Sequence, residues 1–248
     1  MAETKSTKLE TKEYISLLIY GKAGAGKSVL AETFPKALVF DFDNGHKQLA
    51  RAFPDNKVLN TNDGDLLGLL SQAIEQIQLG KFKYETVVID SLTNLENIAI
   101  ANKKGLNREN WASNLYTGKG KSLGYTEWGD VSGSTIALLT YLRQLPVNLV
   151  VITQVETTVD NGIQKFRPNL IGKGADESLH FADIVGYMSV SNGQDGAERY
   201  LHLTSTEDDR FIAKARVLQN SVKPIKNPNY TKLYDLIVKS KPSLKFED

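Results

Sequence analysis

A glycine-rich octapeptide near the start of the chain has the residue types and the spacing of a phosphate-binding loop. Residues 21–28 read Gly-Lys-Ala-Gly-Ala-Gly-Lys-Ser and fit the pattern G-x-x-x-x-G-K-[ST] in full. Glycines let the backbone curl so that successive N–H groups face an anion, while the lysine and the hydroxyl suit phosphates and Mg²⁺. The alternative is a glycine-rich turn with an exposed lysine. The motif predicts a nucleotide site made by Gly21, Lys22, Ala23, Gly24, Ala25, Gly26, Lys27, Ser28 and Val29.

Magnesium also needs a carboxylate at the end of a neighbouring strand, and Asp90 directly follows the apolar run 86–89. We expect Ser28 and Asp90 to hold Mg²⁺ together and Lys27 to reach the β- and γ-phosphates. The alternative is that Asp90 only caps the next helix. Ser91 follows Asp90 where many phosphate-loop ATPases carry a catalytic glutamate, so the base must come from elsewhere.

The candidate base is Asp43, at the tip of a second expected strand over residues 37–42. Ligands of open α/β folds bind at the carboxyl edge of the sheet, where a carboxylate can orient the water that attacks the γ-phosphate. Asp41 alternates with Asp43 and is expected to point to the other side. Alternatively, Asp43 opens a turn with Asn44 and Gly45.

Short apolar runs that alternate with helical patterns must position these side chains. Strands are expected over 15–20, 37–42, 86–89 and 149–153, a polar segment over 101–124, and helices after the glycine-rich loop, over 65–79, around 128–142 and over 230–238. Turn signals such as Asn161-Gly162 predict antiparallel hairpins in the last third. The fold class is therefore α/β, a mostly parallel twisted sheet flanked by helices with C-terminal hairpins. We expect a flexible segment 1–13 and one domain, 14–248, with a core to 190 and a β-rich extension from 191.

Composition excludes several other chemistries. The 248 residues include no cysteine, which removes disulfides, thiolate nucleophiles and cysteine-bound metals, and the three histidines have no metal-ligand spacing. No run approaches the ~20 apolar residues of a membrane span, so no membrane partner is expected. The formal net charge is +1, so any basic surface must be local. Because no Asn-Lys-x-Asp guanine signature is present, ATP is the expected nucleotide.

These motifs together resemble a known group of proteins. A phosphate loop near the N-terminus, an acidic tip on strand two, an Asp-Ser second motif and the strand end Val151-Ile152-Thr153-Gln154 resemble the RecA-like core of P-loop ATPases. More narrowly, the chain resembles short phage-encoded annealing or recombination proteins of the Sak type. The segments that carry this resemblance are Thr33-Phe34-Pro35-Lys36, Asp41-Phe42-Asp43 and Glu127-Trp128-Gly129. The resemblance covers residues 14–216 and implies a location in the cytoplasm, that of a bacterial host if the gene is a phage's.

The resemblance assigns roles to four further positions. Asp43 stands where the family has a catalytic glutamate; it is one methylene shorter, so slow hydrolysis is expected. Gln154 matches the polar sensor that couples the γ-phosphate to a DNA-binding loop, although an ordinary strand-end glutamine is the alternative. Lys214 and Arg216 resemble the Lys-x-Arg pair that is inserted into the ATP site of the neighbouring subunit. Solvated basic residues on an edge strand are the alternative there.

Basic and aromatic residues gather where RecA-like proteins contact DNA. Residues 101–124 hold five basic residues against one acidic residue, together with aromatic rings that can stack on bases. A solvated charged face is the alternative, and for the second candidate loop, after Gln154, it is a simple hairpin around Asn161-Gly162. The expected nucleic-acid contacts are Lys103, Lys104, Arg108, Trp111, Lys119, Lys121, Lys165 and Arg167.

The leading hypothesis is an ATP- and Mg²⁺-dependent ATPase that assembles as a ring or filament on single-stranded DNA and promotes annealing or recombination. A single-strand DNA-binding protein is a further candidate partner. Two alternatives stay open: a nucleotide-gated adaptor or helicase-loader-like protein with little turnover, and a P-loop kinase of a small molecule. The long basic segment and the lack of an Arg-rich lid weigh against the kinase.

Overall fold

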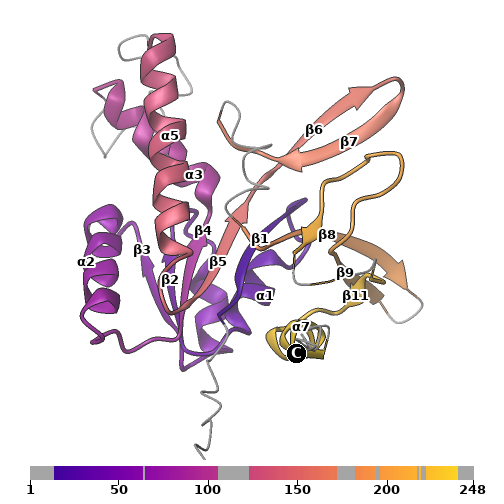
Figure 1. Cartoon of the computed structure of the whole chain (residues 1–248), viewed down its shortest axis with the longest axis horizontal. Helices are drawn as coiled ribbons and strands as arrows, with labels where there is room; N and C mark the ends of the chain where they lie inside the picture. Colours follow the sequence, from indigo (N-terminus) through magenta and orange to yellow (C-terminus); the bar gives the residue numbers. More distant parts are fainter. Residues whose placement is uncertain are drawn as a thin grey trace, which may run out of the picture.

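In the described part of the chain, a nine-stranded sheet forms the centre of the protein (Figure 1). The computed structural model describes residues 14–63, 65–105, 123–171, 182–193, 196–216, 218 and 222–239. The strand order is β11-β9-β8-β1-β5-β4-β2-β3, with β10 also paired to β8, and β6 and β7 form a separate ribbon. The strands are β1 (Ser16–Gly21), β2 (Ala37–Asp41), β3 (Lys57–Asn60), β4 (Thr86–Asp90), β5 (Asn148–Thr153), β6 (Val155–Asp160), β7 (Ile163–Pro168), β8 (Ile184–Gly193), β9 (Gly196–His202), β10 (Lys214–Ala215) and β11 (Ile225–Lys226).

The six strands from β8 to β3 are all parallel, so their carboxyl ends meet at one edge. The register sets Asp41 beside Asp90 and Asp90 beside Ile152, while Thr153 lies beside Tyr20 at the end of β1. The loop after β1 and the acidic tips of β2 and β4 therefore lie side by side. This is the edge at which open α/β sheets bind ligands.

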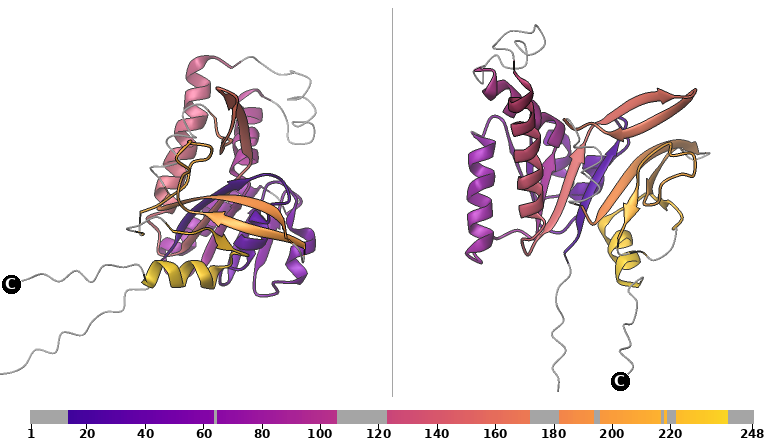
Figure 2. Two further views of the ribbon diagram at one scale, coloured as in Figure 1. Left: turned by 90° about the vertical axis from the view of Figure 1, so that its right-hand side faces the viewer. Right: turned by 45° about the horizontal axis from the view of Figure 1, so that its top comes forward.

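Helices cover both faces of this sheet (Figure 2). Leu18 and Phe40 point to the face that packs against α2 (Leu66–Gln78), α3 (Leu92–Lys103) and α5 (Tyr125–Leu142). Leu17 and Val39 point to the face that packs against α1 (Lys27–Glu32) and α7 (Tyr230–Lys239). Both faces are covered, so the central strands are apolar throughout. No described helix is long and apolar enough to span a bilayer. The 3₁₀ helix η1 (His46–Arg51) follows β2.

Antiparallel hairpins follow β5, as the turn signals predict. β6 and β7 are joined by Asn161 and Gly162, whose positive φ angles of 50° and 78° suit a tight two-residue hairpin turn. β8 and β9 form the second hairpin, and β11 pairs with β9. The predicted α/β class, with a mostly parallel sheet and C-terminal hairpins, is confirmed. The expected boundary at 190 falls inside β8, and β9 extends the same sheet.

α3 is the element that the sequence pattern hides. Residues 101–124 look like one polar segment, yet α3 continues to Lys103. The buried side of α3 includes the polar residues Thr93 and Glu96, so the helix lacks a clean apolar stripe. Its start is set by Ser91, whose side chain accepts a hydrogen bond from the backbone N–H of Asn94.

Candidate active site

The phosphate loop leaves β1 at Gly21 and enters α1 at Lys27. Gly21 can only be glycine, because a Cβ there would collide with the backbone oxygen of Met188 on β8. Gly26 precedes α1 with a φ of 91°, a left-handed conformation that favours glycine. The loop thus reaches the helix through backbone shapes that the motif glycines permit. Ala25 is buried beneath it, whereas Val29 is exposed on α1.

Lys27 lies across the mouth of the loop. Its Nζ donates hydrogen bonds to the backbone oxygens of Gly21, at 2.8 Å, and Lys22, at 3.2 Å. Burial lowers the pKa of Lys27, and the charges of Asp90 and Asp43 oppose that shift. An ammonium group held in this way by neutral carbonyl oxygens can exchange them for the charged oxygens of a phosphate.

Ser28 and Asp90 are joined by a direct hydrogen bond at the N-terminus of α1. The Ser28 Oγ donates to the Asp90 Oδ2 at 2.6 Å. Asp90 does not cap α3, because Ser91 has that role. A hydroxyl oxygen and a carboxylate oxygen at one point are the donor types that Mg²⁺ accepts from proteins.

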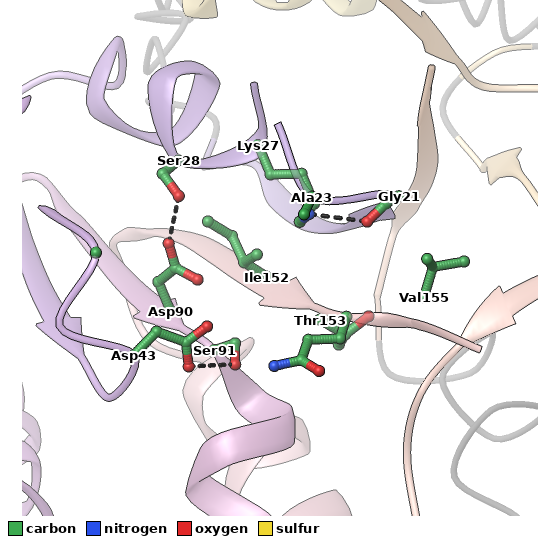
Figure 3. Close-up of a pocket in the computed structure, with 12 residues that line it drawn as sticks. Gly21, Ala23, Lys27, Ser28, Asp43, Asp90, Ser91, Ile152, Thr153 and Val155 are labelled. Atoms are coloured by element: carbon green, nitrogen blue, oxygen red, sulfur yellow. Dashed lines mark hydrogen bonds between the residues drawn. The ribbon is translucent and has the colours of Figure 1, made fainter. Parts of the chain in front are cut away.

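A cavity of about 430 Å³ opens between the phosphate loop and the tips of β2, β4 and β5 (Figure 3). Thr153 lines this cavity, and its Oγ1 is buried with no hydrogen-bond partner in the described part of the chain. The ammonium of Lys27, the hydroxyl of Ser28 and the carboxylate of Asp90 at this cavity are groups that fit a Mg²⁺–nucleotide complex. The cavity is lined by Gly21, Ala23, Lys27, Ser28, Asp43, Gly45, Asp90, Ser91, Ile152, Thr153, Gln154 and Val155.

Asp43 lies at this cavity and is fixed from the start of α3. Its Oδ1 accepts hydrogen bonds from the Ser91 Oγ at 2.8 Å and from the Asn94 Nδ2 at 2.6 Å. Partial burial raises the pKa of the Asp43 carboxyl, and these two donors oppose the shift. Ser91 therefore holds the carboxylate of the neighbouring strand. Asp41 is turned away and buried, and it accepts the backbone N–H groups of Gly45 and His46.

A buried histidine lies behind Asp90, and the sequence reasoning missed it. The His46 Nε2 is 2.8 Å from the Asp90 Oδ2, and its Nδ1 is 2.6 Å from the Glu32 Oε1. Burial alone would lower the pKa of His46, but the hydrogen bonds to Asp90 and Glu32 outweigh it and raise the pKa to about 10. His46 is thus an imidazolium that donates to a carboxylate on each side. No local spacing signals this contact.

A family model described as "AAA domain" matches residues 13–217. The chain belongs to this family of P-loop ATPases. No curated protein matches the sequence. A KaiC-like protein of the hyperthermophilic archaeon Pyrococcus horikoshii OT3 is similar in structure, with a TM-score of 0.45 and 13% sequence identity over 86% of this chain and 84% of that chain.

In this AAA domain, Gln154 follows β5 directly and lines the cavity. Its backbone N–H donates to the Thr93 Oγ1 at 3.1 Å, and its backbone oxygen accepts from Asn169. Thr93 belongs to α3, the helix that also fixes Asp43. The end of β5 is thus tied to α3 before the chain continues into β6. The sensor role of Gln154 stays a prediction.

Lys214 and Arg216 lie far along the sheet from this chain's own phosphate loop. Lys214 pairs with Val185, which aligns with Leu18, three residues before Gly21 along β1. The backbone N–H of Arg216 donates to the oxygen of Asp183. Burial and the nearby Arg216 lower the pKa of Lys214 to about 8. The two residues therefore stand toward the amino end of the strands, and their role in a neighbouring site stays a prediction.

Four of the expected DNA contacts lie in the described part of the AAA domain. Lys103 and Lys104 end α3, and Lys103 forms an ion pair with Asp130. On β7, Lys165 pairs with Asp160 at 2.8 Å and Arg167 with Asp209 at 2.6 Å. These ion pairs neutralise part of the positive charge that would attract DNA phosphates. Outside the described residues lie Arg108, Trp111, Lys119 and Lys121.

Glu96 on α3 makes the stability of this domain depend on pH. Its side chain is buried, its Oε2 accepts the backbone N–H of Ile171, and burial raises its pKa to about 7, against hydrogen bonds that lower it. The unfolded chain titrates near 4.5. The protonated carboxyl therefore contributes its full stability below about pH 4.5, and this is lost as the pH rises through about 7.

We expect Glu96→Gln to increase the free energy of unfolding at pH 8.5 by up to about 3 kcal/mol and to leave it nearly unchanged at pH 4.5. The amide is neutral at both pH values and can still accept from Ile171. Urea denaturation at the two pH values measures the effect. Glu75→Gln, on the exposed side of α2, is the control. An equal response of Glu96→Gln at both pH values would contradict the prediction.

Proposed function

We propose that this chain is an ATP- and Mg²⁺-dependent ATPase that binds single-stranded DNA and promotes annealing or recombination as a homo-oligomer. The cavity that brings together Lys27, Ser28, Asp90 and Asp43 carries the proposal. Each group suits one part of a Mg²⁺–ATP complex: the ammonium suits the phosphates, the hydroxyl and Asp90 suit the metal, and Asp43 suits the attacking water. Bound Mg²⁺ would neutralise charge on the phosphates.

The path from this cavity to the β6–β7 hairpin supports the DNA-binding part of the proposal. Gln154 and Val155 line the cavity and lead directly into the hairpin, which extends beyond the end of β5 (Figure 1). The Lys22 ammonium of the phosphate loop lies 5.2 Å from the ring centre of Phe166 on β7. A change at the phosphates would therefore reach the hairpin from both of its ends.

A nucleotide-gated adaptor with little turnover is the second candidate, and the position of Asp43 favours it. Both donors that fix Asp43 bind the same oxygen, Oδ1, and the side chain is shorter than a glutamate. The carboxylate is thus drawn toward α3. In this reading ATP binding changes the hairpin, while hydrolysis only resets it slowly.

The test measures ATP binding, ATP hydrolysis and DNA binding with the same preparations. We expect single-stranded DNA to stimulate hydrolysis in the unchanged protein and Lys27→Ala to weaken ATP binding by at least about 10-fold, the loss of a charge-assisted hydrogen bond. Lys81→Ala, an exposed lysine after α2, is the control. Absence of any DNA binding would reject the annealing function. ATP binding without turnover in the presence of DNA would favour the adaptor.

A further inference from the structure

His46 joins the helix of the phosphate loop to the carboxylate on β4. Ser28 and Glu32 are four residues apart on α1, so they share one side of that helix. Ser28 donates to the Asp90 Oδ2 directly, and His46 bridges Glu32 to the same oxygen. Among the described residues, the Asp90 carboxylate is therefore held by a donor on α1 and by a donor on η1.

The outer end of this chain of hydrogen bonds is also fixed. The Asn56 Nδ2 donates to the Glu32 Oε2 at 2.7 Å and to the Glu32 backbone oxygen at 2.8 Å. The Asn56 Oδ1 in turn accepts from the backbone N–H of Ala37, at the start of β2. The backbone N–H of His46 donates to Asp41. The imidazole is thus fixed by its ring and by its main chain, and it cannot turn away from Asp90.

Burial of the His46 and Glu32 side chains has a large desolvation cost in free energy. His46 and Glu32 are almost fully inaccessible to solvent, and an apolar cluster of the same volume would serve stability at least as well. The specific result of the polar arrangement is that one oxygen of Asp90 is directed at Ser28. That is the pair of oxygens that the proposed function assigns to Mg²⁺.

We propose that His46 is a positioning residue, which through Glu32 and Asn56 orients the Asp90 carboxylate toward Ser28 for the Mg²⁺ that accompanies the nucleotide. The proposal rests on the proposed function, since it concerns the metal of the same site. It predicts that the effect of losing the His46–Asp90 contact falls on the Mg²⁺-dependent part of nucleotide affinity. Affinity without Mg²⁺, which depends on the loop and Lys27, changes little.

Two neutral substitutions separate the two contacts of His46. A glutamine amide nitrogen lies at nearly the same distance along the side chain as Nε2, so His46→Gln can keep the donor to Asp90. An asparagine amide nitrogen corresponds to Nδ1, so His46→Asn can keep the donor to Glu32 but loses Asp90. Both variants lose the charge and one hydrogen bond, and a purely structural role would affect both alike. Urea denaturation reports whether each variant folds.

The measurement is calorimetric titration of a non-hydrolysable ATP analogue, with Mg²⁺ and with a chelator. Mg²⁺ is expected to increase the affinity of the unchanged protein for the analogue. In His46→Asn this increase should be about 10-fold smaller, the typical effect of removing a hydrogen bond to a metal ligand, whereas His46→Gln should retain most of it. His202→Asn and His202→Gln are the matched controls, because His202 pairs with Ser189 between β8 and β9.

Each outcome decides the proposal. Equal Mg²⁺ responses in the two variants, or a loss of affinity in the chelator that matches the loss with Mg²⁺, would overturn it. If either variant is unfolded, Glu32→Gln gives the same test, because it weakens the anchor of His46 and should reduce the Mg²⁺ response in part. A failure of the unchanged protein to bind the analogue would instead reject the proposed function.

Discussion

The Asp43→Asn variant is expected to bind ATP almost as tightly as the unchanged protein and to hydrolyse it at least about 100-fold more slowly, the typical effect of losing a general base. An amide cannot take the proton of the attacking water. Its oxygen can still accept from Ser91 and Asn94, so the β2 tip and the start of α3 should keep their positions. Single-turnover hydrolysis and equilibrium titration of ATP separate the two effects.

Two further variants test whether the expected loss of hydrolysis is specific to the Asp43 carboxylate. Asp55→Asn changes an exposed carboxylate that lines a different cavity, and it should hydrolyse ATP at the unchanged rate. Asp43→Glu lengthens the side chain by one methylene and should accelerate turnover if reach to the water limits the rate. Equal rates for Asp43→Asn and the unchanged protein would remove Asp43 from the chemistry and would favour the adaptor.

The parts of the candidate site that can be predicted from the sequence are those marked by short local sequence patterns. The glycine pattern lies within eight residues, and Asp43 and Asp90 each follow a short apolar strand. Once the strands are parallel, residues after their carboxyl ends must meet at one edge, whatever their separation in the chain. The structure brings Lys27, Ser28, Asp43 and Asp90 around one cavity for this reason.

The sequence does not predict the roles of His46 and Thr153, because these roles depend on contacts between distant parts of the chain that no local sequence pattern indicates. His46 is 14 residues from Glu32 and 44 residues from Asp90, and only the packing of η1 against α1 and β4 brings the three together. Thr153 has the sequence context of an ordinary β-branched strand residue, yet its hydroxyl is buried with no partner among the described residues. Such groups become visible only when each buried polar atom is matched with its donor or acceptor.

Arg216→Ala is expected to reduce ATP hydrolysis by about 1,000-fold, as the loss of an arginine that acts on a neighbouring site does, while ATP binding changes less than about twofold. The position of β10, toward the amino end of the strands, sets Arg216 apart from the phosphate loop of its own chain. We therefore expect a direct role of Arg216 to be exerted on another subunit. Hydrolysis rates and ATP titrations of the same preparation check both parts. Arg210→Ala is the control, because Arg210 pairs with Asp208 at the surface.

Mixing Arg216→Ala with Lys27→Ala distinguishes a role in a neighbouring subunit from a structural one. In a one-to-one assembly, about a quarter of head-to-tail interfaces combine an intact phosphate loop with an intact arginine from the neighbour. Activity should then return although neither variant is active alone. Absence of recovery in assemblies shown to contain both variants would contradict the interface role. Recovery would mean that the ATP site is complete only between two copies of the chain, so that DNA could control hydrolysis by controlling assembly.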